Sequence, residues 1–200
     1  DLKSVVVSMG TVAASGGYYV AVAADHVMAN PGTVTGSIGV IMEFANVQEL
    51  FRKIGLSAVV IKSGDYKDVG SPLREMTASE KELLQGFIDN VHEQFITAVA
   101  EGRAMPKEAV RAIADGRILS GEQAQKLGLL DSLGNIEDAI VMAAEMGGIT
   151  GEPSVIYAEK EKFSVLELIF GSRFADAVDE FSSAAFHSGY VYVPGRSKNG

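Results

Sequence analysis

The first third of the chain alternates short apolar runs with segments rich in small or polar residues. Runs of apolar and β-branched residues, each closed by glycine, proline or polar residues, predict strands at residues 5–7, 26–29, 37–42 and 58–61. The alanine-rich stretch 12–24 and the stretch 46–53 are typical of helices. Strands that alternate with helices predict βαβ units, and therefore an α/β fold around a mostly parallel sheet.

The middle of the chain changes to a helical pattern after a polar loop at residues 62–72. Thr77 and Glu80 have the spacing of a capping box, and the helix that they open carries apolar residues at helical spacing as far as Val99. Shorter helices are predicted after Pro106, at 120–126 and at 136–146. The last fifty residues predict strands at 154–158 and 190–193 and an amphipathic segment at 163–186. We therefore expect one main domain at residues 1–150 and a C-terminal extension at 151–200.

The composition fits a globular protein and excludes several functions. The chain is 47% apolar and 22% charged, so it can bury a core, and its net charge of -9 argues against nucleic acid as a partner. It contains no cysteine and three widely separated histidines, so we predict no metal and no cofactor. No run of 18 apolar residues is present, and the sequence starts on a strand typical of a sheet's interior. We expect that an N-terminal part is missing.

Ser15 is the strongest candidate for a nucleophile. It is followed by Gly16 and Gly17 at the passage from a strand to a helix, where free N–H groups favour a developing anion. Glycine at position 16 leaves its N–H open to an oxyanion. Serine followed by glycine is also common in tight turns between a strand and a helix that have no catalytic role. The segment further differs from the G-x-S-x-G nucleophile elbow, because Ala13 stands in place of the first glycine.

A serine nucleophile needs a general base. His26 lies at a strand edge, His92 in the long helix and His187 in the tail, so none occupies a loop typical of catalysis, although none is excluded. A lysine can serve instead if it is desolvated, because its usual pKa is about 10.4. Lys67 in the polar loop is the candidate, although loop lysines are usually solvated.

Several segments in order resemble signal peptide peptidase A, a family of serine–lysine peptidases that degrade cleaved signal peptides. The resemblance covers residues 3 to 140, and it rests on Ala14-Ser-Gly-Gly-Tyr-Tyr19, Thr35-Gly-Ser-Ile-Gly-Val40, Lys62-Ser-Gly-Asp-Tyr-Lys-Asp68, Ser71-Pro-x-Arg-x-Met-Thr77, Asp115-Gly-Arg117 and Leu129-Leu-Asp-x-Leu-Gly134.

The resemblance implies a role for each matching residue. Ser15 matches the nucleophile, Lys67 the general base of the short, single-dyad form, and Ser37 the serine that holds the lysine ammonium. The Gly16 N–H matches one oxyanion donor. The family's second donor, a glycine pair on an earlier strand, and its N-terminal membrane anchor have no counterpart in this sequence.

The resemblance also implies a crotonase-like fold, shared with caseinolytic peptidases, whose subunits assemble into rings. We therefore expect a homo-oligomer, with residues 163–186 either at the oligomer face or in ordinary packing. The expected substrates are apolar peptides, above all signal peptides, and Met9 and Gly10 could pair with them by strand addition. The expected location is membrane-associated, with the catalytic domain outside the cytoplasm.

Two other functions stay open at this point. A crotonase-type acyl-CoA enzyme on the same fold would not need Ser15 or Lys67. A non-catalytic scaffold that only binds peptides would keep the fold without turnover.

Overall fold

The computed structural model describes residues 3–157. The chain divides into two compact units, Asp1–Pro153 and Ser154–Gly200. In the second unit residues 154–157 are described, and they contain no helix or strand, so the strand predicted at 154–158 is wrong for the residues described. The predicted segments 163–186 and 190–193 lie outside the described residues, and the functional division at residue 150 stays a prediction. None of the helices in the described part is long and apolar enough to span a membrane.

A parallel sheet forms the centre of the first unit. It has three strands in the order β1-β2-β5, namely Val6–Met9, His26–Ala29 and Ser132–Leu133. Both pairings are parallel, with Val7 opposite Val27 and Met28 opposite Ser132. The predicted strands near 5–7 and at 26–29 are therefore confirmed, as is the α/β fold with a parallel sheet; β5 was not predicted.

The strands predicted at 37–42 and 58–61 are also wrong. A strand does form near the third position, but it is β3 at Val34–Gly36, which pairs antiparallel with β4 at Ile118–Ser120. Residues 37–42 and 58–61 form no strand. Residues 58–61 have the right composition for a strand, but no strand among the described residues pairs with them, and Val59 and Ile61 are 86% and 97% exposed.

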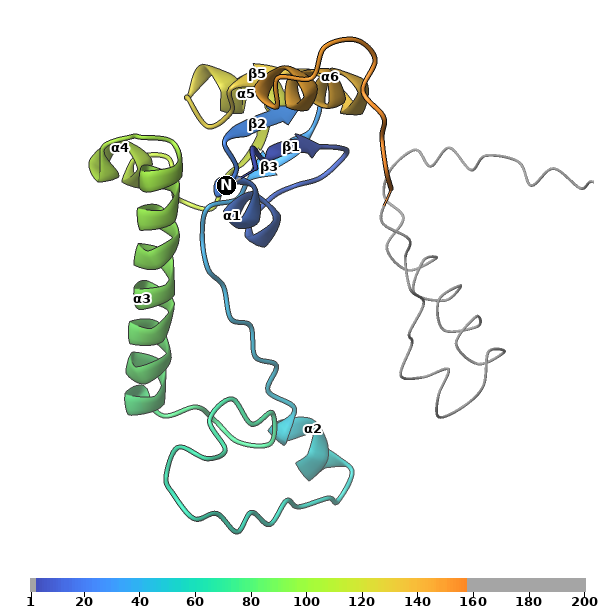
Figure 1. Ribbon diagram of the computed structural model, residues 1–200. Coiled ribbons are helices and arrows are strands. Elements are labelled where there is room, and N and C mark those ends of the chain that lie inside the picture. Colours follow the sequence, from blue (N-terminus) through green and yellow to red (C-terminus); the bar gives the residue numbers. More distant parts are fainter. Residues whose placement is uncertain (1–2, 158–200) are drawn as a thin grey trace, which may run out of the picture. The chain divides into compact units, whose positions relative to one another are not determined.

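Six helices complete the described part of the chain, and Figure 1 shows their arrangement. They are α1 (Gly16–Ala21), α2 (Gln48–Lys53), α3 (Ala78–Gly102), α4 (Lys107–Arg111), α5 (Gly121–Lys126) and α6 (Ile136–Met146). The capping box of Thr77 and Glu80 opens α3 as predicted. Helix α1 is shorter than the predicted helix at 12–24, because the residues before it pair with β3 instead: the Ala13 N–H donates to the Val34 carbonyl at 2.9 Å.

The core joins the sheet to α1 and to the C-terminal half of α3. Tyr18 is fully buried and donates a hydrogen bond to the Leu129 carbonyl at 2.9 Å. Burial raises the pKa of the Tyr18 phenol, so the group stays protonated as a donor. Near the end of α3 a Cβ on Gly102 would lie 2.1 Å from the Val22 carbonyl oxygen, so the two helices can approach only because this position is glycine. These contacts fix α3 against the helix that follows Ser15.

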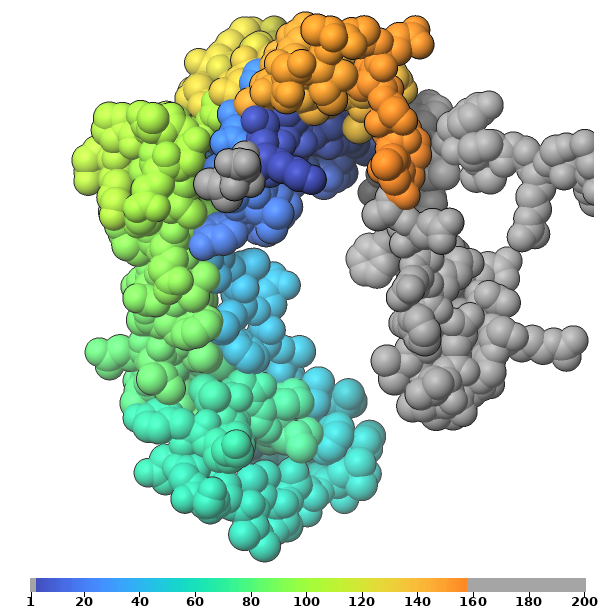
Figure 2. Space-filling model, viewed as in Figure 1, coloured from blue at the N-terminus to red at the C-terminus, as the bar shows by residue number. Residues whose placement is uncertain are grey.

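The N-terminal half of α3 leads away from this core. Its Leu83 and Phe87 are about half exposed, whereas Ile96 and Val99 further along the helix are fully buried. Residues 43–77, which we call the α2 lobe, lie at the N-terminal end of α3, and Figures 1 and 2 show them in cyan to green, away from the sheet. Within the lobe the Val47 N–H donates to the Pro72 carbonyl at 2.8 Å.

Candidate active site

Ser15 has a backbone conformation that disfavours every residue except glycine. Its φ is 51° and its ψ is -119°. The conformation is fixed from both sides: the Ser15 N–H donates to the Gly36 carbonyl at 2.9 Å, and the Ser15 carbonyl accepts from the Tyr19 N–H at 2.8 Å. A serine in this region is strained by about 1–3 kcal/mol, and such strain is typical of residues whose side chain must be presented in one direction.

The backbone next to Ser15 is open. The N–H of Gly16 has no hydrogen-bond acceptor among residues 3–157. A Cβ built on Gly16 would meet no atom within 4 Å. An anionic oxygen formed beside Ser15 could therefore reach this N–H, as predicted for an oxyanion donor.

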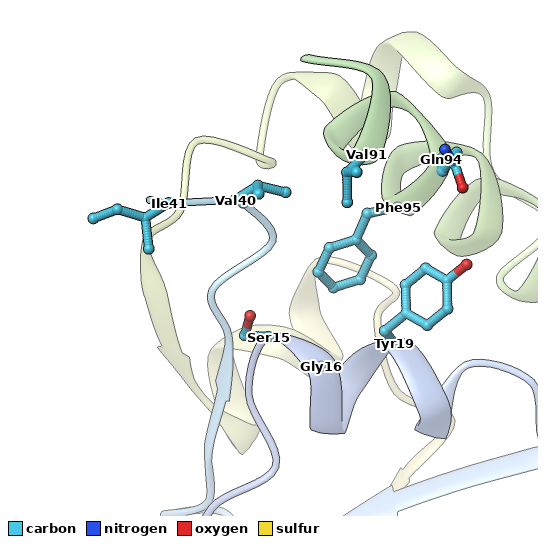
Figure 3. A pocket seen from close by; sticks show the side chains of 9 residues that line it. Ser15, Gly16, Tyr19, Val40, Ile41, Val91, Gln94 and Phe95 are labelled. Carbon is cyan, nitrogen blue, oxygen red and sulfur yellow. The ribbon is translucent and has the colours of Figure 1, made fainter. Parts of the chain in front are cut away.

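Ser15 borders an apolar pocket of about 420 Å³. Figure 3 shows Val91 and Phe95 on α3, Tyr19 on α1, and Val40 and Ile41 on the segment after β3, all around a space that the Ser15 hydroxyl also borders. The Tyr19 and Phe95 rings pack edge to face, with centroids 5.0 Å apart. Gly16, Gly39 and Gln94 complete the lining. A pocket with these walls suits an apolar side chain.

A second, more polar pocket of about 530 Å³ also has Ser15 in its wall. Ser37 shares this wall, so the structure brings the predicted nucleophile and the predicted lysine-orienting serine to one cavity. Ser37 also has a positive φ of 51°, and its N–H donates to the Arg117 carbonyl at 2.8 Å. The remaining lining residues are Gly39, Val40, Ile41, His92, Ala114, Asp115 and Gly116.

His92 and Asp115 in this wall were not predicted as site residues. Nε2 of His92 is buried and has no hydrogen-bond partner within the described part of the chain. Asp115 accepts from Arg117 Nε at 2.8 Å, and this hydrogen bond lowers the pKa of Asp115 to about 2, so its carboxylate is charged at neutral pH. The sequence placed His92 on a long helix but could not show which face of that helix meets Ser15. Asp115 had one signal, because it begins a motif of the family resemblance.

The structure does not bring Lys67 to Ser15 within one chain. Lys67 is exposed and lines neither pocket. In Figure 1 the segment between α2 and α3 lies at the N-terminal end of α3, whereas α1 lies beside the C-terminal half. The dyad of Ser15 and Lys67 therefore stays a prediction, and the described part of one chain does not bring the two residues to a common pocket.

Met9 and Gly10 also lie outside the two pockets. The Met9 side chain is 2% exposed and belongs to the core, and Thr33 Oγ1 lies 3.1 Å and 2.6 Å from the carbonyl oxygens of Met9 and Gly10. Strand β1 has a neighbour on one side only among the described strands, so it is an edge strand of the described sheet. A substrate role for these residues stays a prediction.

A family model and several relatives with protease names match this chain. The model of peptidase family S49 matches residues 1–150. A protein of Synechocystis sp. that carries a protease name is 50% identical over 145 residues, which are 72% of this chain and 52% of that relative. Protease 4 of Salmonella typhi is 37% identical over 72% of this chain and 23% of its own length. The chloroplastic serine protease SPPA of Arabidopsis thaliana is 34% identical over 80% of this chain and 24% of its own length. The chain thus spans about half the length of the Synechocystis relative and less of the other two.

Proposed function

Because the chain belongs to peptidase family S49, we propose that it is a serine endopeptidase whose nucleophile is Ser15. The observation that carries this proposal is the strained Ser15 at the border of an apolar pocket, next to a backbone N–H without a partner. Membership of a peptidase family argues against the acyl-CoA enzyme as the alternative.

The proposed reaction is acyl transfer in two steps. Ser15 Oγ attacks the peptide carbonyl while the general base takes the hydroxyl proton, and the Gly16 N–H donates to the oxyanion of the tetrahedral intermediate. The base then gives that proton to the leaving amine, and an acyl group stays on Ser15. Water, activated by the same base, attacks this ester and releases the acid. No step needs a metal or a cofactor.

We assign the base to Lys67 and its place to the polar pocket. A lysine exposed to water is protonated at neutral pH, so it must enter a desolvated site before it can accept a proton. The cavity that Ser15 and Ser37 share has the right neighbours for a lysine Nζ, since Ser37 Oγ can accept a hydrogen bond from it. In this assignment Ser37 orients the lysine.

We further propose that the lysine in each site comes from a second copy of the chain. Lys67 belongs to the α2 lobe, which lies at the N-terminal end of α3, and it lines neither pocket. Large apolar side chains are exposed along the same part of the chain, including Val59, Ile61 and Phe87, as expected for a surface that another subunit covers. This is the homo-oligomer that the family resemblance implies.

The substrates proposed are apolar peptides, with cleaved signal peptides as the natural class. The pocket walls of Tyr19, Val40, Val91 and Phe95 support an apolar side chain beside the scissile bond. A crotonase-like fold and a membrane-associated location, outside the cytoplasm, belong to the same proposal.

The test is turnover of an apolar peptide by the unmodified chain and by two variants. Ser15→Ala and Lys67→Ala should each retain less than about a tenth of the activity, because nucleophile and base act as a unit. A mixture of the two variants should recover about a quarter of the activity if the dyad forms between copies and subunits assort randomly. No recovery would place both residues in one chain, and no turnover by the unmodified chain would favour a peptide-binding scaffold.

A further inference from the structure

The loop that carries Lys67 contains two lysines, and among the described residues only Lys62 has a partner for its ammonium group. In this loop, residues 62–72, which we call the lysine loop, Lys62 Nζ donates to the Asp65 carbonyl and to Asp68 Oδ1, both at 2.7 Å. The Lys67 side chain makes no hydrogen bond or ion pair with any described residue, and it is exposed. Its backbone is nevertheless held, because the Lys67 N–H donates to the Gly64 carbonyl at 3.1 Å.

Arg74 binds the residue next to Lys67 through both its side chain and its backbone. Arg74 Nε donates to Asp68 Oδ2 at 2.9 Å, and Nη2 donates to Oδ1 at 2.8 Å. Nη2 also lies 3.2 Å from the Asp68 carbonyl oxygen. Such a two-pronged contact fixes direction as well as distance, which a lysine at position 74 could not do.

The same guanidinium is attached to the first turn of α3. Arg74 Nη1 donates to Glu80 Oε2 at 2.8 Å, and Nη2 donates to Glu80 Oε1. Glu80 is 3% exposed, and its carboxylate also accepts from the Thr77 N–H at 2.8 Å as part of the capping box. A continuous series of contacts therefore runs from α3 through Glu80, Arg74 and Asp68 to the backbone of Lys67.

A second contact fixes the other side of the lysine loop. Gly70 has a φ of +78°, and a Cβ at this position would lie 2.4 Å from the Phe44 ring. The loop backbone thus packs directly on an aromatic side chain of the same lobe. The loop is therefore held on two sides, by Arg74 at Asp68 and by Phe44 at Gly70.

We propose that Arg74 is a positioning residue for the general base: it holds Asp68 against α3 and so presents Lys67 in one place with its ammonium unpaired. This inference rests on the proposed role of Lys67. Stabilising α3 alone does not account for Arg74, because the capping box of Thr77 and Glu80 needs no arginine. The bonds to the Asp68 carboxylate and carbonyl serve only the loop.

Arg74 also prevents a competing interaction. The Asp68 carboxylate receives bonds from Arg74 and Lys62, so it is not free to capture the adjacent Lys67 ammonium. A carboxylate at position 68 without these partners would be available to pair with Lys67, and such a pair favours the protonated lysine, which cannot act as a base.

The experiment compares Arg74→Met with Arg52→Met, a matched control in the same lobe whose arginine pairs with the exposed Glu49 and with no other residue between 3 and 157. Hydrogen exchange of the full chain, without peptide, reports on the loop directly. In Arg74→Met the amides of Lys67, Val69 and Ser71, which are bonded within the loop, should lose protection by at least about tenfold. The buried C-terminal half of α3 and the Arg52→Met control should keep their protection.

Peptide turnover then separates positioning from simple support. We expect kcat of Arg74→Met to fall by about 100-fold, since a misplaced base slows the chemical step, while KM stays within about twofold. The kcat of Arg74→Lys should lie between those of Arg74→Met and the unmodified chain. If Arg74→Met does not fold, Asp68→Asn takes its place in the comparison. Unchanged loop protection, or lost protection with unchanged kcat, would overturn the proposal. A wild-type chain without turnover would refute the proposed function itself. Hydrogen exchange needs no peptide, so it still tests whether Arg74 holds the loop, and the failure of the Arg74 proposal can be told from the failure of the proposed function.

Discussion

Replacing Ser15 by glycine should stabilise the protein while it removes the nucleophile. The backbone at Ser15, with φ 51° and ψ -119°, lies in a region that glycine occupies without strain. The strain of a non-glycine residue there is about 1–3 kcal/mol. Glycine has more conformational freedom in the unfolded chain, which offsets about 0.5–1 kcal/mol of the gain. The net expectation is a free energy of unfolding that is higher by up to about 2.5 kcal/mol.

The matched control is Ser15→Ala, which removes the same hydroxyl but keeps the Cβ and therefore the strain. Urea denaturation should give a higher midpoint for Ser15→Gly than for Ser15→Ala with nearly the same slope, since the two variants differ by one methyl group. For a chain of this size 1 kcal/mol corresponds to about 2–4 °C in Tm. Neither variant should cleave peptides. If Ser15→Gly were no more stable than Ser15→Ala, the conformation assigned to Ser15 would be wrong, and with it the argument from strain.

Two further predictions concern α3 and the lysine loop. Gly102→Ala should destabilise the fold by about 1–3 kcal/mol, because the added Cβ meets the Val22 carbonyl oxygen at 2.1 Å. Gly86→Ala on the same helix should instead stabilise the fold by about 0.5–1 kcal/mol, because its added Cβ meets no atom within 4 Å. Thermal unfolding compares the two variants, and equal effects would contradict the close approach of α1 and α3. Hydrogen bonds from Arg74 and the Thr77 N–H lower the pKa of Glu80 from 4.5 to about 2, and those from Arg74 and Lys62 hold the pKa of Asp68 well below its usual value. Both carboxylates therefore stabilise the loop above their unfolded pKa values, and this stabilisation is lost as the pH falls from about 4.5 toward 2. Amide exchange at Lys67, corrected for its intrinsic pH dependence, should show this loss, and a loop equally protected at about pH 5 and pH 2 would refute it.

The sequence predicted those elements whose signal is local. Thr77 and Glu80 mark the start of α3 because a capping box is complete within four residues, and the helix at 136–146 was found with its exact bounds. The strands at 37–42 and 58–61 were wrong because β-propensity describes the residue, whereas a strand also needs a neighbouring edge.

The candidate site divides in the same way. Ser15, Gly16 and Ser37 were predicted from motifs, and the structure places all three at the walls of two adjoining pockets. His92 could not be predicted as a wall residue, because its position depends on how α3 packs against α1. The distance between Lys67 and Ser15 could not be predicted either, since it depends on the course of the chain between β3 and α3.

The most direct test of the central claim is the identity of the residue that a fluorophosphonate probe modifies. An activated serine hydroxyl attacks phosphorus and expels fluoride, so the probe marks a nucleophile that has a working base. Peptide mapping by mass spectrometry should place the adduct on Ser15 in the unmodified chain. Ser15→Ala should stay unlabelled, and Lys67→Ala should react at least about 100-fold more slowly. An adduct on another residue, an unlabelled wild-type chain, or Lys67→Ala reacting at the wild-type rate would contradict the assignment of Ser15 and Lys67.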